Sequence, residues 1–100
     1  MNEENLNIKK NELLRQFEHR VDGKLIKVEY SEQGKNIFLT RFEIDKSLES
    51  SNFKDLFIKS LLDKLSDEGH LVVPTCPIVA SFFKGHRTDY RHLLPAGINL

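Results

Sequence analysis

The chain has 100 residues, enough for one domain with a two-layer core and too few for a separate substrate domain. Its 15 Lys and Arg residues balance 15 Asp and Glu residues, so no nucleic-acid or membrane partner is expected. One cysteine excludes an internal disulfide framework, and no histidine shows zinc-site spacing with it, so no metal is expected. A reducing, cytoplasmic location is expected, because no apolar run approaches the roughly 20 residues of a membrane span and MNEENLNIKK lacks a signal peptide's apolar core.

The first half of the chain has the pattern of antiparallel strands. Residues 1–11 are polar and predict a flexible lead-in or a short first strand. Asp22 and Gly23 separate two strand-prone runs and predict a hairpin, and the polar segment around Gly34 predicts a second turn. A three-stranded antiparallel meander is therefore expected over residues 16–45.

The hydrophobic pattern then changes to helical spacing. Apolar residues recur at intervals of three and four positions from Phe53 to Leu65, and Gly69 ends the run. Ser51 or Asn52 can cap the start of this segment. The sequence therefore predicts one long helix in this part of the chain.

A short apolar strand over residues 70–74 and a second helix from Pro77 to Gly85 complete the expected elements. Together they predict an α+β fold, an α/β sandwich, with one domain over residues 12–94 and a tail over residues 95–100. The inward face of the second helix is expected to carry Ile78, Val79, Phe82 and Phe83.

The only cysteine lies where the last strand meets the second helix. Pro77 suits the first helical position and disfavours helical backbone at the residue before it, so Cys76 is the expected N-cap. Its sulfur would lie beside unpaired N–H groups and the positive end of the helix dipole, which favours a thiolate or binds an acceptor oxygen. The alternative is a small buried apolar residue, which taken alone is the commoner role of a free cysteine.

Three motifs occur together in this chain: Val-Val-Pro-Thr-Cys-Pro over residues 72–77, Asp22-Gly23 followed by Tyr30, and His86 followed by Tyr90. They resemble the small, single-domain branch of the GNAT-like N-acetyltransferases. The resemblance implies a mixed sheet whose strands splay near the middle, with acetyl-CoA in the split. It also implies an amine of unknown identity as the second substrate, attacking the thioester carbonyl directly.

The resemblance also assigns candidate site residues. Cys76 is the first catalytic candidate, as an acid, a base or an acyl acceptor, and Tyr90 is the second. The segment His86–Tyr90 resembles the branch's His-Pro-Glu-Tyr, but it has one extra residue and no proline. The residues that the resemblance places at the cofactor are Ser50, Ser51, Asn52, Lys54, Thr75 and His86.

The expected pyrophosphate-binding loop, residues 49–54, departs from the family pattern. It lacks the family's glycines, with Asn52 and Lys54 in their place, and side chains there hinder close approach of the backbone to phosphate. Glu49 stands where Arg or Gln is expected and would repel a diphosphate. Lys54 could compensate in part, and Ser50 and Ser51 could donate hydrogen bonds, so weakened cofactor binding is expected.

Two functions from different classes follow. One is an acetyl-CoA-dependent N-acetyltransferase with weakened cofactor binding, and the alternative is a catalytically inactive GNAT-like binding or interaction module.

Arg41 stands where the branch commonly has a histidine in Thr-His-Thr, and a guanidinium stays protonated and cannot act as a base. A homodimer formed through an exposed sheet edge is also possible.

Overall fold

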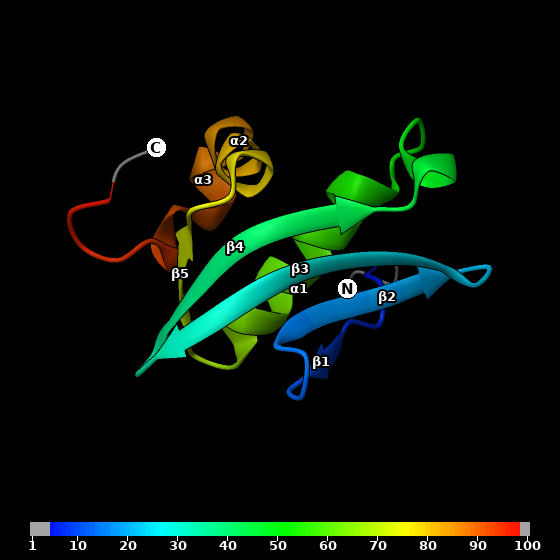
Figure 1. Cartoon of the computed structure of the whole chain (residues 1–100). Helices are drawn as coiled ribbons and strands as arrows, with labels where there is room; N and C mark the ends of the chain where they lie inside the picture. The colour runs from blue at the N-terminus through cyan, green and yellow to red at the C-terminus, as the bar shows by residue number, and fades with distance from the viewer. Residues whose placement is uncertain (1–4, 99–100) are drawn as a thin grey trace.

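Five strands form one mixed sheet in the order β1-β2-β3-β4-β5 (Figure 1). The first four strands pair antiparallel, each with the next, and β5 pairs parallel with β4. The computed structural model describes residues 5–98. The strands are β1 (Lys9–Asn11), β2 (Gln16–Val21), β3 (Lys24–Gln33), β4 (Asn36–Ile44) and β5 (Leu71–Pro74).

Two tight turns fix the meander of β2, β3 and β4. Asp22 and Gly23 have φ values of 51° and 80°, the left-handed pair that a two-residue type I′ hairpin requires. Gly34 has a φ of 59° in the turn between β3 and β4. The meander predicted over residues 16–45 is therefore confirmed.

A β-bulge in β4 keeps its hydrophobic residues in phase with the core. The register between β3 and β4 shifts at Glu29 and Tyr30, which leaves Thr40 as an extra residue on β4. Thr40 and Arg41 are both exposed, whereas Phe42 is buried. Without the extra residue, strict alternation would turn Arg41 toward the core. The bulge therefore places the Arg41 side chain in solvent.

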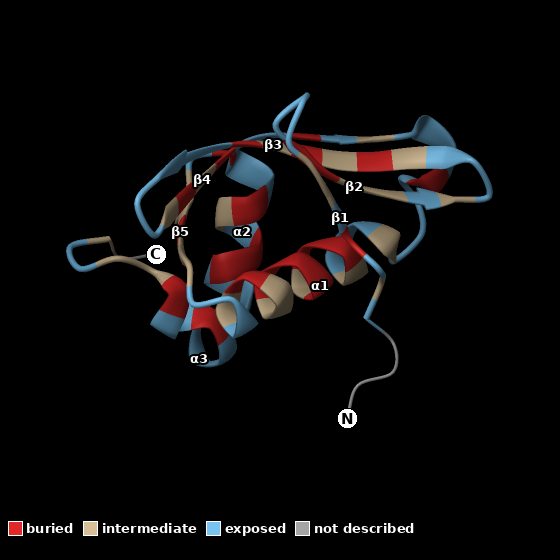
Figure 2. Ribbon diagram, turned by 90° about the horizontal axis from the view of Figure 1, so that it is seen from below, coloured by how far each residue is buried: buried red, intermediate tan, exposed pale blue. Residues whose placement is uncertain are grey.

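Both long helices lie on the same face of the sheet, with their buried sides toward it (Figure 2). The predicted long helix is α1, and its end at a left-handed Gly69 (φ 82°) is confirmed. Within residues 5–98, no helix has the length and apolar character needed to cross a membrane. The helical elements are η1 (Lys46–Leu48), α1 (Phe53–Asp67), α2 (Pro77–Gly85), α3 (Arg87–Tyr90) and η2 (Arg91–Leu93).

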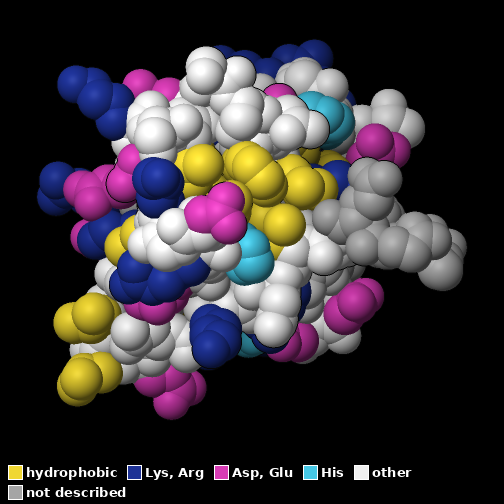
Figure 3. Space-filling model, turned by 90° about the vertical axis from the view of Figure 1, so that its right-hand side faces the viewer, with side chains coloured by type: hydrophobic (Ala, Val, Ile, Leu, Met, Phe, Trp, Pro, Cys, Tyr) yellow, Lys and Arg dark blue, Asp and Glu magenta, His cyan; other side chains and the backbone are white. Residues whose placement is uncertain are grey.

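The core lies between the sheet and these helices. Its largest fully buried side chains come from three strands, both long helices and η2, and they include Phe17, Phe57 and Phe83. Seen from the end where the Asp22-Gly23 turn and η1 lie, hydrophobic side chains gather in the middle of the surface, with charged side chains around them (Figure 3). Packing of helices on one face leaves the other face of the sheet exposed to solvent.

Of the two alternatives expected for the start of the chain, the short first strand is observed, and the flexible lead-in over residues 1–11 needs correction. Residues 9–11 of the expected lead-in form β1, which pairs with β2, and Ile8 is buried. The N–H of Leu6 also donates to Oγ of Ser60 on α1 at 2.8 Å. Ordered structure therefore begins before residue 12, and pairing with β2 is what orders this polar segment. Residues 1–4 of the lead-in, like 99–100 of the expected tail, lie outside the described residues.

The inward face of α2 is narrower than predicted. Val79, Phe82 and Phe83 are buried as expected, whereas the side chain of Ile78 is 38% exposed. Ile78 follows Pro77 in the first turn, where the helix has only begun to pack on the sheet. The prediction that Ile78 faces inward is wrong.

Candidate functional site

Strands β4 and β5 separate after the pair Leu39–Pro74. The carbonyl of Leu39 accepts two hydrogen bonds from the residues that follow β5: from the N–H of Cys76 and from Oγ1 of Thr75, both at 3.0 Å. These bonds hold the start of α2 against the middle of β4. The rest of β4, residues 40–44, has β3 as its only strand neighbour in the described sheet. The β4 and β5 ribbons diverge there (Figure 1).

Cys76 lies at this separation point. Its backbone is extended (φ −83°, ψ 129°), and Pro77 begins α2 directly after it, so the predicted N-cap position is confirmed. The Cys76 side chain makes no capping hydrogen bond and is 4% exposed. Its place next to the strand split fits a catalytic role, and its burial fits the apolar alternative.

A groove of about 200 Å³ lies between the first turns of α1 and the last turn of α2. Two of the residues predicted to contact the cofactor, Asn52 and His86, line it together. The lining also includes residues that sequence reasoning did not single out as cofactor contacts: Asp55, Leu56, Lys59 and Phe82.

The His86 ring is fixed at the mouth of this groove. It stacks on Phe82 with ring centroids 4.0 Å apart and an interplanar angle of 15°. Nδ1 of His86 lies 2.9 Å from the carbonyl oxygen of Phe82. Because a carbonyl only accepts, Nδ1 is the nitrogen that donates in this contact.

The loop before α1 uses one of its predicted cofactor contacts internally. Oγ of Ser51 donates to the carbonyl of Leu48 at 2.6 Å and accepts from the N–H of Phe53 at 3.2 Å. The hydroxyl proton of Ser51 is therefore already engaged. Sequence reasoning expected a cap from Ser51 or Asn52, and the structure places Asn52 at the N-cap position while Ser51 supplies the hydrogen bond.

Other donors of the loop face outward. The backbone N–H groups of Asn52, Lys54 and Asp55 have no acceptor among residues 5–98, as is usual in the first turn of a helix. Lys54 and Ser50 are exposed. Glu49 is exposed too, so a carboxylate shares this surface with the donors.

Tyr90 contacts α1 farther along the helix than the loop and groove at its start. Its hydroxyl donates to Oδ1 of Asp63 at 2.9 Å, and its side chain is 7% exposed. Burial raises the pKa of Tyr90 well above its usual range, and the hydrogen bond to the Asp63 carboxylate is the second cause of this rise. Asp63 lies ten residues into α1, about 15 Å along the helix axis from its start. The structure therefore does not bring the Tyr90 hydroxyl together with residues 50–54.

Asp63 joins α3, α1 and the N-terminal segment. Burial disfavours its charge, but hydrogen bonds from Asn5, Tyr90 and Lys59 outweigh this and lower the pKa of Asp63 below its ordinary value of 3.8. A lowered folded-state pKa adds stability that is present above the unfolded pKa and is lost as the pH falls through the folded one. The network thus stabilises the protein at neutral pH and loses that contribution in acid.

Replacing Tyr90 by Phe removes one charge-assisted hydrogen bond from this network. We expect the free energy of unfolding at neutral pH to fall by about 1.5–3 kcal/mol. Because the bond is weaker once Asp63 is protonated, the difference should narrow below pH 3.8. Urea unfolding at neutral pH and below pH 3.8 measures the difference in the free energy of unfolding between the two proteins. Tyr30→Phe, a change at a second buried tyrosine, is the control. A constant difference across the pH range would contradict this role for Asp63.

Comparison with known proteins decides the family. A family model described as GCN5-related N-acetyl-transferase matches residues 16–93. The chain belongs to this family. Its fold is similar to that of a Staphylococcus aureus protein solved by NMR and described as a GCN5-like N-acetyltransferase, with a TM-score of 0.64 and 16% identity over 95% of this chain and 92% of that chain. No curated protein matches the chain.

Membership in the GCN5-related family confirms the resemblance seen in the sequence and the α+β fold expected from it. It supports an acetyl-transfer function and does not favour the alternative of an inactive binding module. In this GCN5-related domain, β4 and β5 separate after the pair Leu39–Pro74, and the groove beside His86 includes Asn52, the N-cap of α1.

Proposed function

We propose that the protein transfers an acetyl group from acetyl-CoA to an amine, with the cofactor held between β4, the start of α1, and α2. The separation of β4 from β5 carries this proposal, because it leaves residues 40–44 with a strand edge that β5 does not pair. An extended chain with amide groups can hydrogen-bond to such an edge. The groove of Asn52 and His86, between α1 and α2, is a second place where the cofactor could make contacts. Family membership supports the reaction class.

The reaction needs one bond made, one broken and two protons moved. The amine nitrogen attacks the thioester carbonyl, a C–N bond forms, and the C–S bond breaks. A base takes the proton from the nitrogen, and the CoA sulfur receives one. The chain's task is to hold the thioester at the strand split and to provide these proton transfers.

The residues around the start of α1 fit a pyrophosphate only in part. Outward N–H groups at Asn52 and Lys54, the ammonium of Lys54 and the hydroxyl of Ser50 are suitable partners for phosphate oxygens. The exposed carboxylate of Glu49 opposes an anion, and the side chain of Asn52 hinders close approach of the backbone. Cofactor binding weaker than that of a glycine-rich loop follows from this set.

The remaining candidate residues have separate proposed roles. His86 would contact the cofactor in the groove, whereas Thr75 would fix the point at which the strands separate, since its hydroxyl donates to Leu39. Cys76, at the same split, is the proposed chemical group, as acid, base or acyl acceptor. Tyr90 would position His86 and Phe82, whose rings lie 6.5 and 5.8 Å from its own.

Calorimetric titration of the purified chain with acetyl-CoA and with CoA tests the proposal. Saturable binding of both ligands is expected, with micromolar to millimolar dissociation constants because of the substituted loop. ATP, which shares the adenosine diphosphate part of CoA but lacks the pantetheine arm, serves as the control and should bind more weakly. Absence of heat with acetyl-CoA and CoA at millimolar concentrations would overturn acetyl-CoA as the donor.

A further inference from the structure

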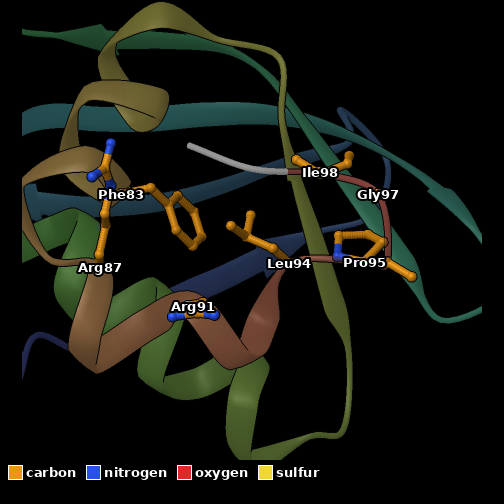
Figure 4. Close-up of a pocket in the computed structure, with 8 residues that line it drawn as sticks. Phe83, Arg87, Arg91, Leu94, Pro95, Gly97 and Ile98 are labelled. Carbon is orange, nitrogen blue, oxygen red and sulfur yellow. The ribbon is translucent and has the colours of Figure 1, made fainter.

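A second pocket, of about 400 Å³, lies where α2 and α3 meet the segment that follows η2 (Figure 4). It shares no lining residue with the groove between α1 and α2. Its wall includes Phe83, Arg87, Arg91, Leu94, Pro95 and Ile98. It is therefore a separate feature of the surface, about twice as large as the groove.

Arg87 and Arg91 give this pocket its charge. They are four residues apart in one continuous helical stretch, so they project from the same side of it. Both are exposed, neither takes part in a salt bridge within residues 5–98, and no Asp or Glu lines the pocket. Two guanidinium groups without an anionic partner suit a planar or tetrahedral oxyanion, which each can bind with paired hydrogen bonds.

The rest of the wall is apolar. Phe83 is 1% exposed, and Leu94, Pro95 and Ile98 are half-buried. Figure 4 shows the Phe83 ring and the Leu94 side chain pointing toward each other, with the two arginines on the α3 side and Pro95 to Ile98 on the other. An occupant that fills this space must therefore present an apolar group as well as an anion.

We propose that this pocket binds a small organic oxyanion, namely an apolar group that carries a carboxylate or a phosphate. The arginines would hold the oxyanion, and Phe83, Leu94 and Ile98 would contact the apolar part. Mixed recognition of this kind discriminates against inorganic phosphate, which lacks the apolar part, and against neutral aromatics, which lack the charge. The proposal does not depend on acetyl transfer, because the two sites share no residue.

Titration of ¹⁵N-labelled protein with phenyl phosphate and with 4-phenylbutyrate, followed by amide chemical shifts, tests the proposal. We expect saturable shifts in residues 83–98 with at least one probe, and the probe that binds more tightly identifies the anion as phosphate or carboxylate. Inorganic phosphate and phenol should each bind about tenfold more weakly or worse, because each makes only half of the contacts. No saturable shift with either probe would overturn the proposal.

Variants separate this pocket from general electrostatic attraction. Arg87→Gln with Arg91→Gln should weaken the tighter probe by about tenfold or more, whereas Lys84→Gln, which removes an exposed cation of α2 outside the pocket, should leave its affinity within about twofold. The Lys replacements at both arginines keep the charge but lose the paired geometry and should give an intermediate affinity. An equal loss in Lys84→Gln would overturn the proposal. The proposal would also be overturned if adenosine 3′,5′-bisphosphate changed the amide shifts of residues 94–98 and bound more tightly than either probe, because the pocket would then belong to the cofactor site.

Discussion

Replacing Cys76 by Ser or by Ala is expected to lower the rate of acetyl transfer by about 10²–10⁴-fold, the usual contribution of one positioned proton-transfer group. The thiol lies at the N-terminus of α2, where Leu39 fixes the Cys76 backbone at the split of the sheet. Because the side chain is small and almost fully buried, the fold should survive with a loss of about 1 kcal/mol. A steady-state acetylation assay with an amine panel, together with thermal unfolding of each variant, measures both effects.

The pair of Cys76 variants also distinguishes the three roles. Ser keeps a hydroxyl that can relay a proton weakly, so a rate above that of Ala indicates an acid or a base. Detection of a chain heavier by one acetyl group after mixing with acetyl-CoA, absent in both variants, indicates an acyl acceptor. Undiminished turnover by the Ala variant would show that Cys76 is only a buried apolar residue of the core.

Reversing the charge of Lys54 is the second large expected effect. Lys54→Glu should weaken CoA binding by about 10- to 100-fold, because a cation beside the outward N–H groups of α1 becomes an anion. Glu49→Gln should act in the opposite direction and tighten binding by several-fold. Calorimetric titration with CoA at low and high salt measures both changes.

The control for this pair is Lys35→Glu, an exposed reversal in the turn between β3 and β4, far along the chain from α1. It changes the net charge by the same amount as Lys54→Glu. If Lys35→Glu weakened CoA binding as much as Lys54→Glu, the attraction would come from net charge alone. The pyrophosphate would then have no defined site at residues 50–54.

Much of the fold follows from local signals in the sequence. Asp22 and Gly23 specify a two-residue hairpin because both adopt positive φ, and Gly69 ends α1 for the same reason. Pro77 defines both the start of α2 and the extended conformation of Cys76. These residues act through their own backbone preferences, so no tertiary information is needed to interpret them.

Two features of the sheet depend on partners that a single segment does not reveal. β1 has one strongly buried neighbour, Ile8, and three polar residues, so its existence depends on pairing with β2. The bulge at Thr40 left a trace in the sequence, since Leu39 and Phe42 are three positions apart rather than two or four. Only the register with β3 shows that this interval is a bulge.

The candidate site also has some parts that local sequence predicts and others that depend on packing between distant segments. The candidate residues Cys76 and Thr75 come from a local motif, and both bond to the carbonyl of Leu39 at the point where β4 and β5 separate. The groove between α1 and α2 was not foreseen, because helical spacing shows which residues share a face but not which faces meet. The partner of Tyr90, Asp63, lies 27 residues away along the chain and is fixed only by the packing of α3 on α1.

The most direct test of a cofactor held between β4, α1 and α2 is a map of amide chemical shifts during titration with acetyl-CoA. Shifts that saturate together in residues 40–44, 50–56 and 82–86 are the expected result, because these segments form the unpaired edge, the donor loop and the groove. Saturable shifts confined to β1 and β2, or to residues 94–98 of the arginine pocket, would place the ligand elsewhere and contradict this site.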